Sequence, residues 1–129
     1  MKKNAFSAYK QNRLHGIQEA SPVRLVALLL DESIACCLTA AAASENGSVA
    51  LKGQSLSKAM AIIDAGLLDV LDHQKGGAVA ANMALVYNYC LKTLAGANIS
   101  NDPLPMRECA GLLSQIREGW RAAEALERS

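Results

Sequence analysis

Apolar side chains recur at helical spacing through most of the chain, in four blocks that turn-forming residues separate. The first block begins at Ser21-Pro22 and continues to Asn46-Gly47. A serine side chain can accept a hydrogen bond from the first turn of a helix, and proline is tolerated at the first helical position because that amide is otherwise unpaired. Asn46-Gly47 can supply a left-handed cap. The pattern therefore predicts a helix from Pro22 to between residues 44 and 47.

Three further blocks follow, and each predicts one helix. The second runs from about residue 54 to 72 and the third from residue 77 or 78 to about 97, with Gly76-Gly77 between them. Residues 98–103 form a turn cluster, in which Asp102 can cap a fourth helix that starts at Pro103 or Pro105 and continues to about Leu126. Helices of about 20 residues joined by short connections pack as antiparallel neighbours. We therefore predict an all-α fold, an antiparallel up-and-down four-helix bundle over residues 21–129, preceded by a mobile N-terminal arm or short extra helix over residues 1–20.

The composition supports this fold class. The sequence is 51% hydrophobic but only 4% aromatic, and it contains 23 Ala and 18 Leu against 6 Val and 6 Ile. Ala and Leu favour helices, whereas strands favour β-branched and aromatic residues. An all-β fold is excluded on this basis, and so is a disordered chain, which would be poor in apolar residues.

The charge is divided unevenly along the chain. Residues 1–24 carry five basic residues and one acidic residue, a net charge of +4, and the remainder carries a net charge of −3. A nucleic-acid-binding protein more often has a basic stripe on its folded body, so we do not expect a nucleic-acid partner. The N-terminus has no apolar targeting segment, and Arg24, Asp31 and Glu32 interrupt the apolar stretch over residues 23–43. We therefore predict a cytoplasmic protein that does not insert into a membrane.

The sequence offers no catalytic or metal-binding constellation. Its four cysteines form no Cys-x-x-Cys pair and occupy apolar helical positions, which predicts buried, reduced thiols. His15 and His73 complete no zinc pattern, and His73 is interpreted as a charge partner at the C-terminal end of the second helix. We found no Glu-x-x-His motif and no phosphate-binding loop. We expect no cofactor, no metal ion and no enzyme activity.

The first helix is more apolar than a four-helix bundle requires. Residues 25–30 are apolar around the whole circumference of the helix, yet each helix of such a bundle has one outward side. Either Phe6, Tyr9, Leu14 and Ile17 of the arm cover the excess, or a helix of another protein lies there. Both interpretations hold if the arm and the partner compete for one groove.

Three aromatic residues and one amide have predicted orientations. Tyr87 and Tyr89 are two residues apart on one helix, so their side chains project about 200° apart. We predict that Tyr89 packs in the core, one turn after Leu85, and that Tyr87 faces the surface or a groove. Trp120 is predicted to pack in the core. Asn82 lies in an apolar stretch and bonds either a neighbouring helix or a partner.

Several short motifs, in a fixed order over about a hundred residues, carry a resemblance to a known family. They are Tyr9, Ala20-Ser21-Pro22, Leu25-Val26, Leu29-x-Asp31-x-x-Ile34, Leu71-Asp72, Gly76-Gly77-x-x-Ala80-x-Asn82-x-x-x-Val86-Tyr87-x-Tyr89, Leu94, Ala97-Asn98, Asp102, Leu113, Arg117-Glu118 and Trp120. Together they resemble the FliS family of flagellar secretion chaperones. The chain departs from the family pattern at Glu19, where Thr is usual, and at Leu30, Glu32 and Ser33 of the first helix.

The resemblance implies a small helical-bundle chaperone, without nucleotide or metal. It implies binding to the disordered C-terminal segment of flagellin, which prevents premature polymerisation and supports delivery to the flagellar type III export apparatus. Export-gate components, other flagellar regulators and a second copy of the chain are further expected partners. A helical regulatory module that binds another protein or nucleic acid is the alternative. The predicted partner-binding residues are Tyr9, Leu14, Ile17, Leu25, Leu28, Leu29, Asn82, Met83, Val86 and Tyr87.

Overall fold

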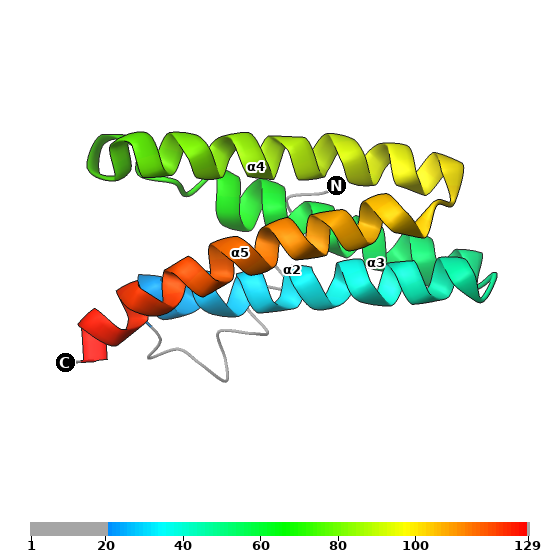
Figure 1. Ribbon diagram of the computed structural model, residues 1–129, viewed down its shortest axis with the longest axis horizontal. Helices are drawn as coiled ribbons and strands as arrows, with labels where there is room; N and C mark the ends of the chain where they lie inside the picture. The colour runs from blue at the N-terminus through cyan, green and yellow to red at the C-terminus, as the bar shows by residue number, and fades with distance from the viewer. Residues whose placement is uncertain (1–20, 129) are drawn as a thin grey trace.

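The computed structural model describes residues 21–128, which form four long helices and no strand (Figure 1). They are α2 (Pro22–Glu45), α3 (Val49–Ala61) with its continuation in the π-helix η1 (Ile62–Leu68), α4 (His73–Ser100) and α5 (Pro103–Arg128). Successive helices run in opposite directions, which confirms the predicted all-α bundle. The predicted N-terminal arm lies outside the described residues.

The start and end of α2 follow the predicted signals. The backbone amide of Arg24 donates a 3.1 Å hydrogen bond to the side chain of Ser21, and Pro22 occupies the first turn. After Glu45 the chain turns at Gly47, whose φ of 75° lies in the left-handed region that glycine adopts without strain. Local capping chemistry is therefore sufficient to set both ends of this helix.

The second helix begins earlier than predicted and changes its winding. It starts at Val49, where the Lys52 amide donates to the Ser48 carbonyl at 2.9 Å. The predicted start near residue 54 was too late. Val49 and Leu51 in the first turn are exposed and lie outside the buried stripe, so the apolar pattern does not include them. From Ile62 the backbone adopts π-helical winding, which is wider than an α-helix and differs from the regular helix predicted there.

The third helix is preceded by a separate helical turn. The side chain of Asp72 accepts a 3.0 Å hydrogen bond from the Lys75 amide, and so caps a turn that begins at His73. The prediction that His73 lies at the C-terminal end of a helix was wrong, because the second helix ends earlier, at Leu68. Gly77, with φ 50° and ψ −125°, separates this turn from the continuous helix that follows.

The ends of α4 and α5 meet in a tight connection. Asn101 closes α4 in the left-handed conformation, with φ 59°, and its amide donates to the Ala97 carbonyl at 2.8 Å. Asp102 then accepts a 3.0 Å hydrogen bond from the Leu104 amide, which confirms the predicted cap of α5. The third helix therefore extends to Ser100, a few residues beyond the predicted end.

The core runs along the centre of the bundle, with α2 packed against α3, η1 and α5. α4 packs on α5, η1 and α3. The largest completely buried aliphatic side chains are Leu30, Leu56, Ile62, Ile63, Leu67, Leu94, Met106 and Leu113. All four cysteines are buried free thiols, as predicted.

By length and composition α2 is apolar enough to cross a membrane. Its contacts are those of a core helix, however, since its buried residues pack into the centre of the bundle. The two carboxylates in its middle also bind side chains of other helices. Asp31 pairs with Arg117 of α5 at 2.8 Å, and Glu32 pairs with Lys58 of α3 at 2.9 Å. These contacts place α2 inside the bundle.

Candidate partner-binding site

The structure divides the predicted partner-binding residues into three groups. Tyr9, Leu14 and Ile17 lie outside the described residues. Leu29 and Tyr87 are buried in the core, with 5% and 0% of their surface exposed, so neither is available on the surface of the folded bundle. The remaining five are accessible: Leu25, Leu28, Met83 and Val86 are half-buried, and Asn82 is exposed.

The predicted orientations of the two α4 tyrosines were wrong. They do point in different directions, but Tyr87 packs in the core while Tyr89 is 46% exposed and donates a 2.7 Å hydrogen bond to Glu108 Oε1 on α5. The prediction paired Tyr89 with Leu85, which is itself 69% exposed. The buried face of α4 instead follows Ala80, Tyr87, Cys90, Leu94 and Ala97. Trp120 packs against the core and is partly buried.

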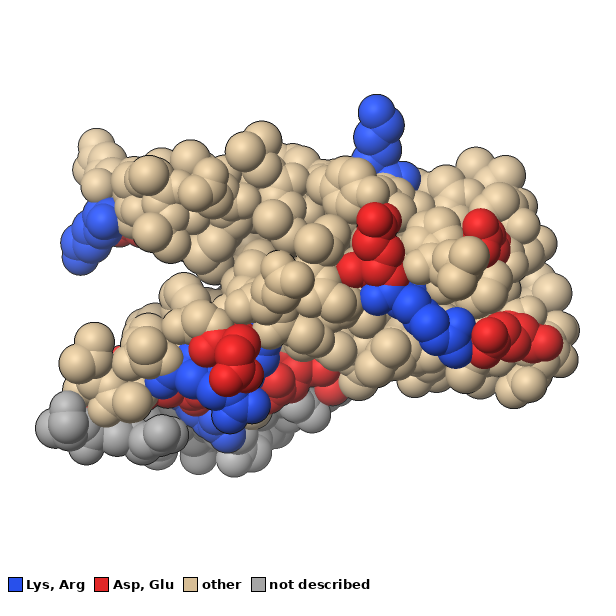
Figure 2. All heavy atoms as spheres, viewed as in Figure 1, with Lys and Arg blue, Asp and Glu red and all other residues tan. Residues whose placement is uncertain are grey.

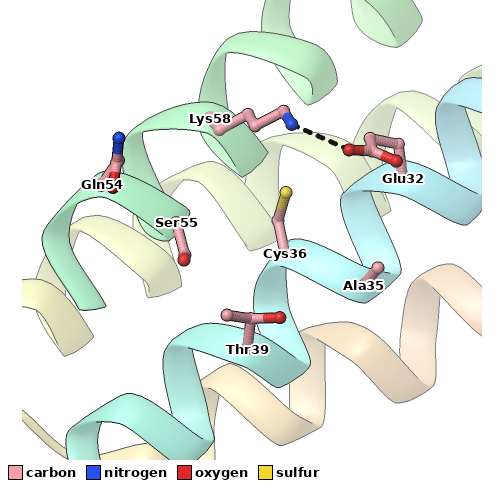
Figure 3. Close-up of a pocket in the computed structure, with 7 residues that line it drawn as sticks. All are labelled: Glu32, Ala35, Cys36, Thr39, Gln54, Ser55 and Lys58. Atoms are coloured by element: carbon pink, nitrogen blue, oxygen red, sulfur yellow. Dashed lines mark ion pairs between the residues drawn. The ribbon is translucent and has the colours of Figure 1, made fainter. Parts of the chain in front are cut away.

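A hollow of about 310 Å³ forms a short groove between α2 and α3. The residues that line the hollow are Glu32, Ala35, Cys36 and Thr39 of α2 and Gln54, Ser55 and Lys58 of α3 (Figure 3). On α2, Leu25 and Leu28 precede Glu32 at spacings of three and four residues, so they belong to the same face of the helix. Two predicted partner-binding residues therefore lie on the face of α2 that leads into the hollow.

The walls of this hollow combine small side chains with one ion pair. Lys58 Nζ binds Glu32 Oε1 across the groove at 2.9 Å (Figure 3). Cys36 is 8% exposed, and burial raises the pKa of its thiol, so the sulfur stays protonated at neutral pH. The sequence-based prediction missed this hollow, because the spacing of Ala35 and Thr39 places them on one face of α2 but does not show that α3 lies beside that face.

A second depression is a notch at the end of the bundle where α2 begins. Figure 2 shows the N-terminal half of α4 diverging there from the ends of α2 and α5. Positions equally far from the α4–α5 turn lie at the same level in two antiparallel helices, which places Met83 level with Trp120. Met83, Val86, Ile116 and Trp120 are all partly buried at the edge of the core. The two helices that border the notch, α4 and α5, therefore carry partly buried apolar residues at this level.

A network of charged side chains fixes α5 to α2 beside the notch. Glu124 is only 6% exposed, and it binds Arg24 at 2.8 Å and Arg117 at 2.9 Å. Arg117 in turn binds Asp31. The hydrogen bond from Arg24, followed by that from Arg117, lowers the pKa of the Glu124 carboxyl. The Trp120 indole also donates to the Val23 carbonyl at 2.8 Å, so this wall of the notch is held by several directed bonds.

Within residues 21–128, no group of three or more His, Cys, Asp or Glu side chains is arranged to hold a metal ion. The features described above are a helical groove, an apolar notch and a set of structural ion pairs. They define the class of the protein as a small all-α helical bundle with concave features on its surface and no metal centre among its described residues.

Comparison with known proteins identifies the family. The family model described as flagellar protein FliS matches residues 3–127. The flagellar secretion chaperone FliS of Salmonella typhimurium is 39% identical over 119 residues, which cover 92% of this chain and 88% of the relative. The chaperone FliSB of Pseudomonas aeruginosa is 33% identical over 90% of this chain and 92% of its own length. FliS of Bacillus subtilis is 31% identical over 97% of this chain and 90% of its own length. The chain belongs to the FliS family, whose members are flagellar secretion chaperones and not enzymes.

Proposed function

We propose that the chain is a cytoplasmic chaperone that binds the disordered C-terminal segment of flagellin. In this role it prevents premature polymerisation and supports delivery of flagellin to the flagellar type III export apparatus. The family membership supports a role in flagellar export. The observation that carries the flagellin proposal is the half-buried face of α2, where Leu25 and Leu28 lead into the hollow between α2 and α3.

The physical properties of such a client match these surfaces. A disordered segment loses conformational entropy when it folds on a partner, so it requires a long apolar surface in return. An amphipathic helix can lay one apolar face into a groove between two helices. The accessible apolar face of α2 at Leu25 and Leu28 and the partly buried apolar residues of α4 and α5 offer two such surfaces, on different helices.

The proposed contact residues are those that remain accessible in the folded bundle. They are Leu25 and Leu28 at the groove and Met83 and Val86 at the notch, with Asn82 as an exposed neighbour. We also propose that Tyr9, Leu14 and Ile17 compete with the client for the same surfaces. Leu29 and Tyr87 act only through the core on which these surfaces rest. Binding to export-gate components or other flagellar regulators, and pairing of two copies, stay predictions.

Size-exclusion chromatography of the chain mixed with monomeric flagellin tests the proposal. We expect a 1:1 complex with full-length flagellin and none with flagellin that lacks its C-terminal segment. The truncated flagellin is the matched control, because it keeps the remaining surface of the client. Failure to form a complex, or equal binding of both forms of flagellin, would contradict the proposal. A salt-dependent complex with DNA or RNA would favour a regulatory module instead.

A further inference from the structure

The outward face of α4 is exposed and almost uncharged. Residues 76–100 include one charged side chain, Lys92, whereas α5 carries eight charged residues among its 26. α4 packs on α5, η1 and α3 and lies on the opposite side of the bundle from α2 (Figure 1). The face of α4 that points away from the core presents a row of exposed residues at helical spacing, here called the α4 stripe: Ala78, Ala81, Leu85, Tyr89, Lys92, Gly96 and Ile99.

The large aliphatic side chains of the α4 stripe project into solvent. Leu85 is 69% exposed and Ile99 is 85% exposed. From Ala78 to Ile99 the stripe extends over about 33 Å of helix, which is about six turns. An exposed row of this length with a single charge is typical of a surface that another helix covers.

The order of large and small residues along the α4 stripe is self-complementary. When two copies pack their α4 helices antiparallel about a twofold axis, each residue faces the one that is equally far from the axis on the second copy. An axis beside Tyr89 places Ala78 opposite Ile99 of the second copy, and Ala81 opposite Gly96. Each large Ile99 then meets a small residue, and the contact of Ala81 with Gly96 lets the two helices approach closely.

The charged groups at this face are complementary in the same arrangement. Leu85 faces Lys92 of the second copy, and the methylene chain of a lysine can pack over an aliphatic side chain. Glu108 of α5 lies beside the stripe, where it accepts a 2.7 Å hydrogen bond from Tyr89. Within residues 21–128, neither Lys92 nor Glu108 belongs to an ion pair.

These two unpaired charges come together only in the pair of copies. Tyr89 is one turn from Leu85, so the Lys92 ammonium group that lies over Leu85 of the second copy can reach Glu108 of that copy. The twofold axis repeats the contact, so the pairing satisfies two cations and two carboxylates. Charge complementarity therefore favours a second copy of this chain as the occupant of the stripe.

We infer that the α4 stripe is the contact between two copies of the free chain, packed antiparallel about a twofold axis beside Tyr89, with Lys92 and Glu108 paired across the contact. The contact leaves α2 and the hollow between α2 and α3 uncovered in each copy, because α2 lies on the opposite side of the bundle. One pair of helices is a small interface, so the dimer dissociates on dilution. This pairing is independent of which client the chain carries.

Sedimentation velocity of the full chain, without client, tests the pairing. Over a series from about 10 μM to about 500 μM we expect the average mass to rise from that of a monomer toward that of a dimer. Leu85→Lys places a second positive charge opposite Lys92 and should raise the dissociation constant by about tenfold or more. Gln115→Lys adds the same charge at an exposed position of α5 and should leave the dissociation constant unchanged. Circular dichroism establishes that both variants fold as the wild type does.

Charge exchange and cross-linking test the register of the two helices. Lys92→Glu and Glu108→Lys should each weaken the dimer, and the double variant should recover it, because the facing charges again have opposite signs. Tyr89→Cys, beside the axis, should form an intermolecular disulfide on mild oxidation, whereas Gln115→Cys should not. The four native cysteines are buried and do not interfere.

Two results would overturn the inference and leave the proposed function intact. One is a wild-type chain that stays monomeric over the whole concentration series, or a dimer that Leu85→Lys does not weaken. The other is a Leu85→Lys variant that associates as the wild type does but no longer forms the complex with flagellin, since the stripe would then be a surface for the client.

Discussion

Tyr87 and Tyr89 lie in opposite environments although only one residue separates them on α4. Tyr87 has no exposed surface, and its hydroxyl has no hydrogen-bond partner among the described residues. Tyr89 reaches over the surface and donates to Glu108. Burial raises the pKa of the Tyr87 hydroxyl, so the hydroxyl stays protonated. The core therefore contains a neutral polar group whose desolvation is not offset by a hydrogen bond within residues 21–128.

Replacement of Tyr87 by Phe is expected to preserve stability or to raise the free energy of unfolding by about 1 kcal/mol, because it removes an unpaired polar atom and keeps the ring. Tyr89→Phe is the matched control and loses one exposed hydrogen bond, which costs about 0.5 kcal/mol. Urea denaturation followed by circular dichroism measures both. A loss of more than about 1 kcal/mol in Tyr87→Phe would show that the hydroxyl does have a bonding partner.

Glu124→Gln is expected to reduce the sensitivity of the fold to acid. The pKa of Glu124 is lowered in the folded chain by Arg24 and Arg117, so its ionised form stabilises the fold above the unfolded-state pKa of about 4.3. This contribution is lost as the pH falls through the lower folded-state pKa. Melting temperatures between pH 7 and pH 3 should therefore decline less steeply in Glu124→Gln than in the wild type.

Glu118→Gln is the control for that experiment. Glu118 is exposed and binds only Arg121 on its own helix in the described hydrogen bonds and ion pairs, so its substitution removes the same charge from a solvated pair. Its pH profile should match that of the wild type. Parallel profiles for the wild type and Glu124→Gln would contradict the role given to the network around Glu124.

Lys52→Met is expected to lower the free energy of unfolding by about 2 kcal/mol, since it removes a buried charged donor that bonds two acceptors at the end of α4. Lys52 Nζ donates to the Asn98 carbonyl and to the Asn101 side chain, and so connects α3 with the end of α4. Lys92→Met on the exposed side of α4 is the control and should change stability by less than about 0.5 kcal/mol. Equal effects of the two substitutions in chemical denaturation would exclude the proposed structural role of Lys52.

Two glycine-to-alanine substitutions are expected to act in opposite directions. Gly77→Ala should cost about 1–3 kcal/mol, because φ 50° with ψ −125° is a backbone conformation that a residue with a Cβ atom adopts only with strain. Gly111→Ala should stabilise the fold by about 0.4–1 kcal/mol, because Gly111 lies inside α5 and an added Cβ would meet no atom within 4 Å. Thermal denaturation measures both effects. An unchanged melting temperature in Gly77→Ala would contradict the strained backbone conformation at this position.

The features of the fold that could be predicted from sequence are those that local chemistry determines. Ser21-Pro22 and Asp102 cap their helices as expected because a cap involves only the next few residues. The π-helical winding at Ile62–Leu68 has no such local signal. This winding places Ile62, Ile63 and Leu67 in the core together. Their burial depends on contacts of η1 with α2 and α4, which a local pattern does not show.

The candidate site was predictable in part for a similar reason. The apolar excess over residues 25–30 pointed to α2 as a docking helix, and Leu25 and Leu28 do lie on an accessible face. Helical geometry could not decide which of Tyr87 and Tyr89 is buried, because that depends on how α4 is rotated against α5 and η1. The hollow was missed because it results from small side chains on two helices that only the tertiary structure brings together.

The two ends of the bundle differ in how firmly they are closed. At one end, Lys52 and Ser44 both donate hydrogen bonds to the residues that terminate α4, so three helix ends are connected there. At the other end, Gly77 interrupts α4 with a non-helical conformation, and the helix diverges from α2 and α5. Local unfolding should therefore require progressively less free energy along α4 from Ser100 toward Ala78. Backbone amides near Ala78 should exchange with deuterium first. The C-terminal end of α4 is then the stable end of the helix, and its N-terminal end opens most easily.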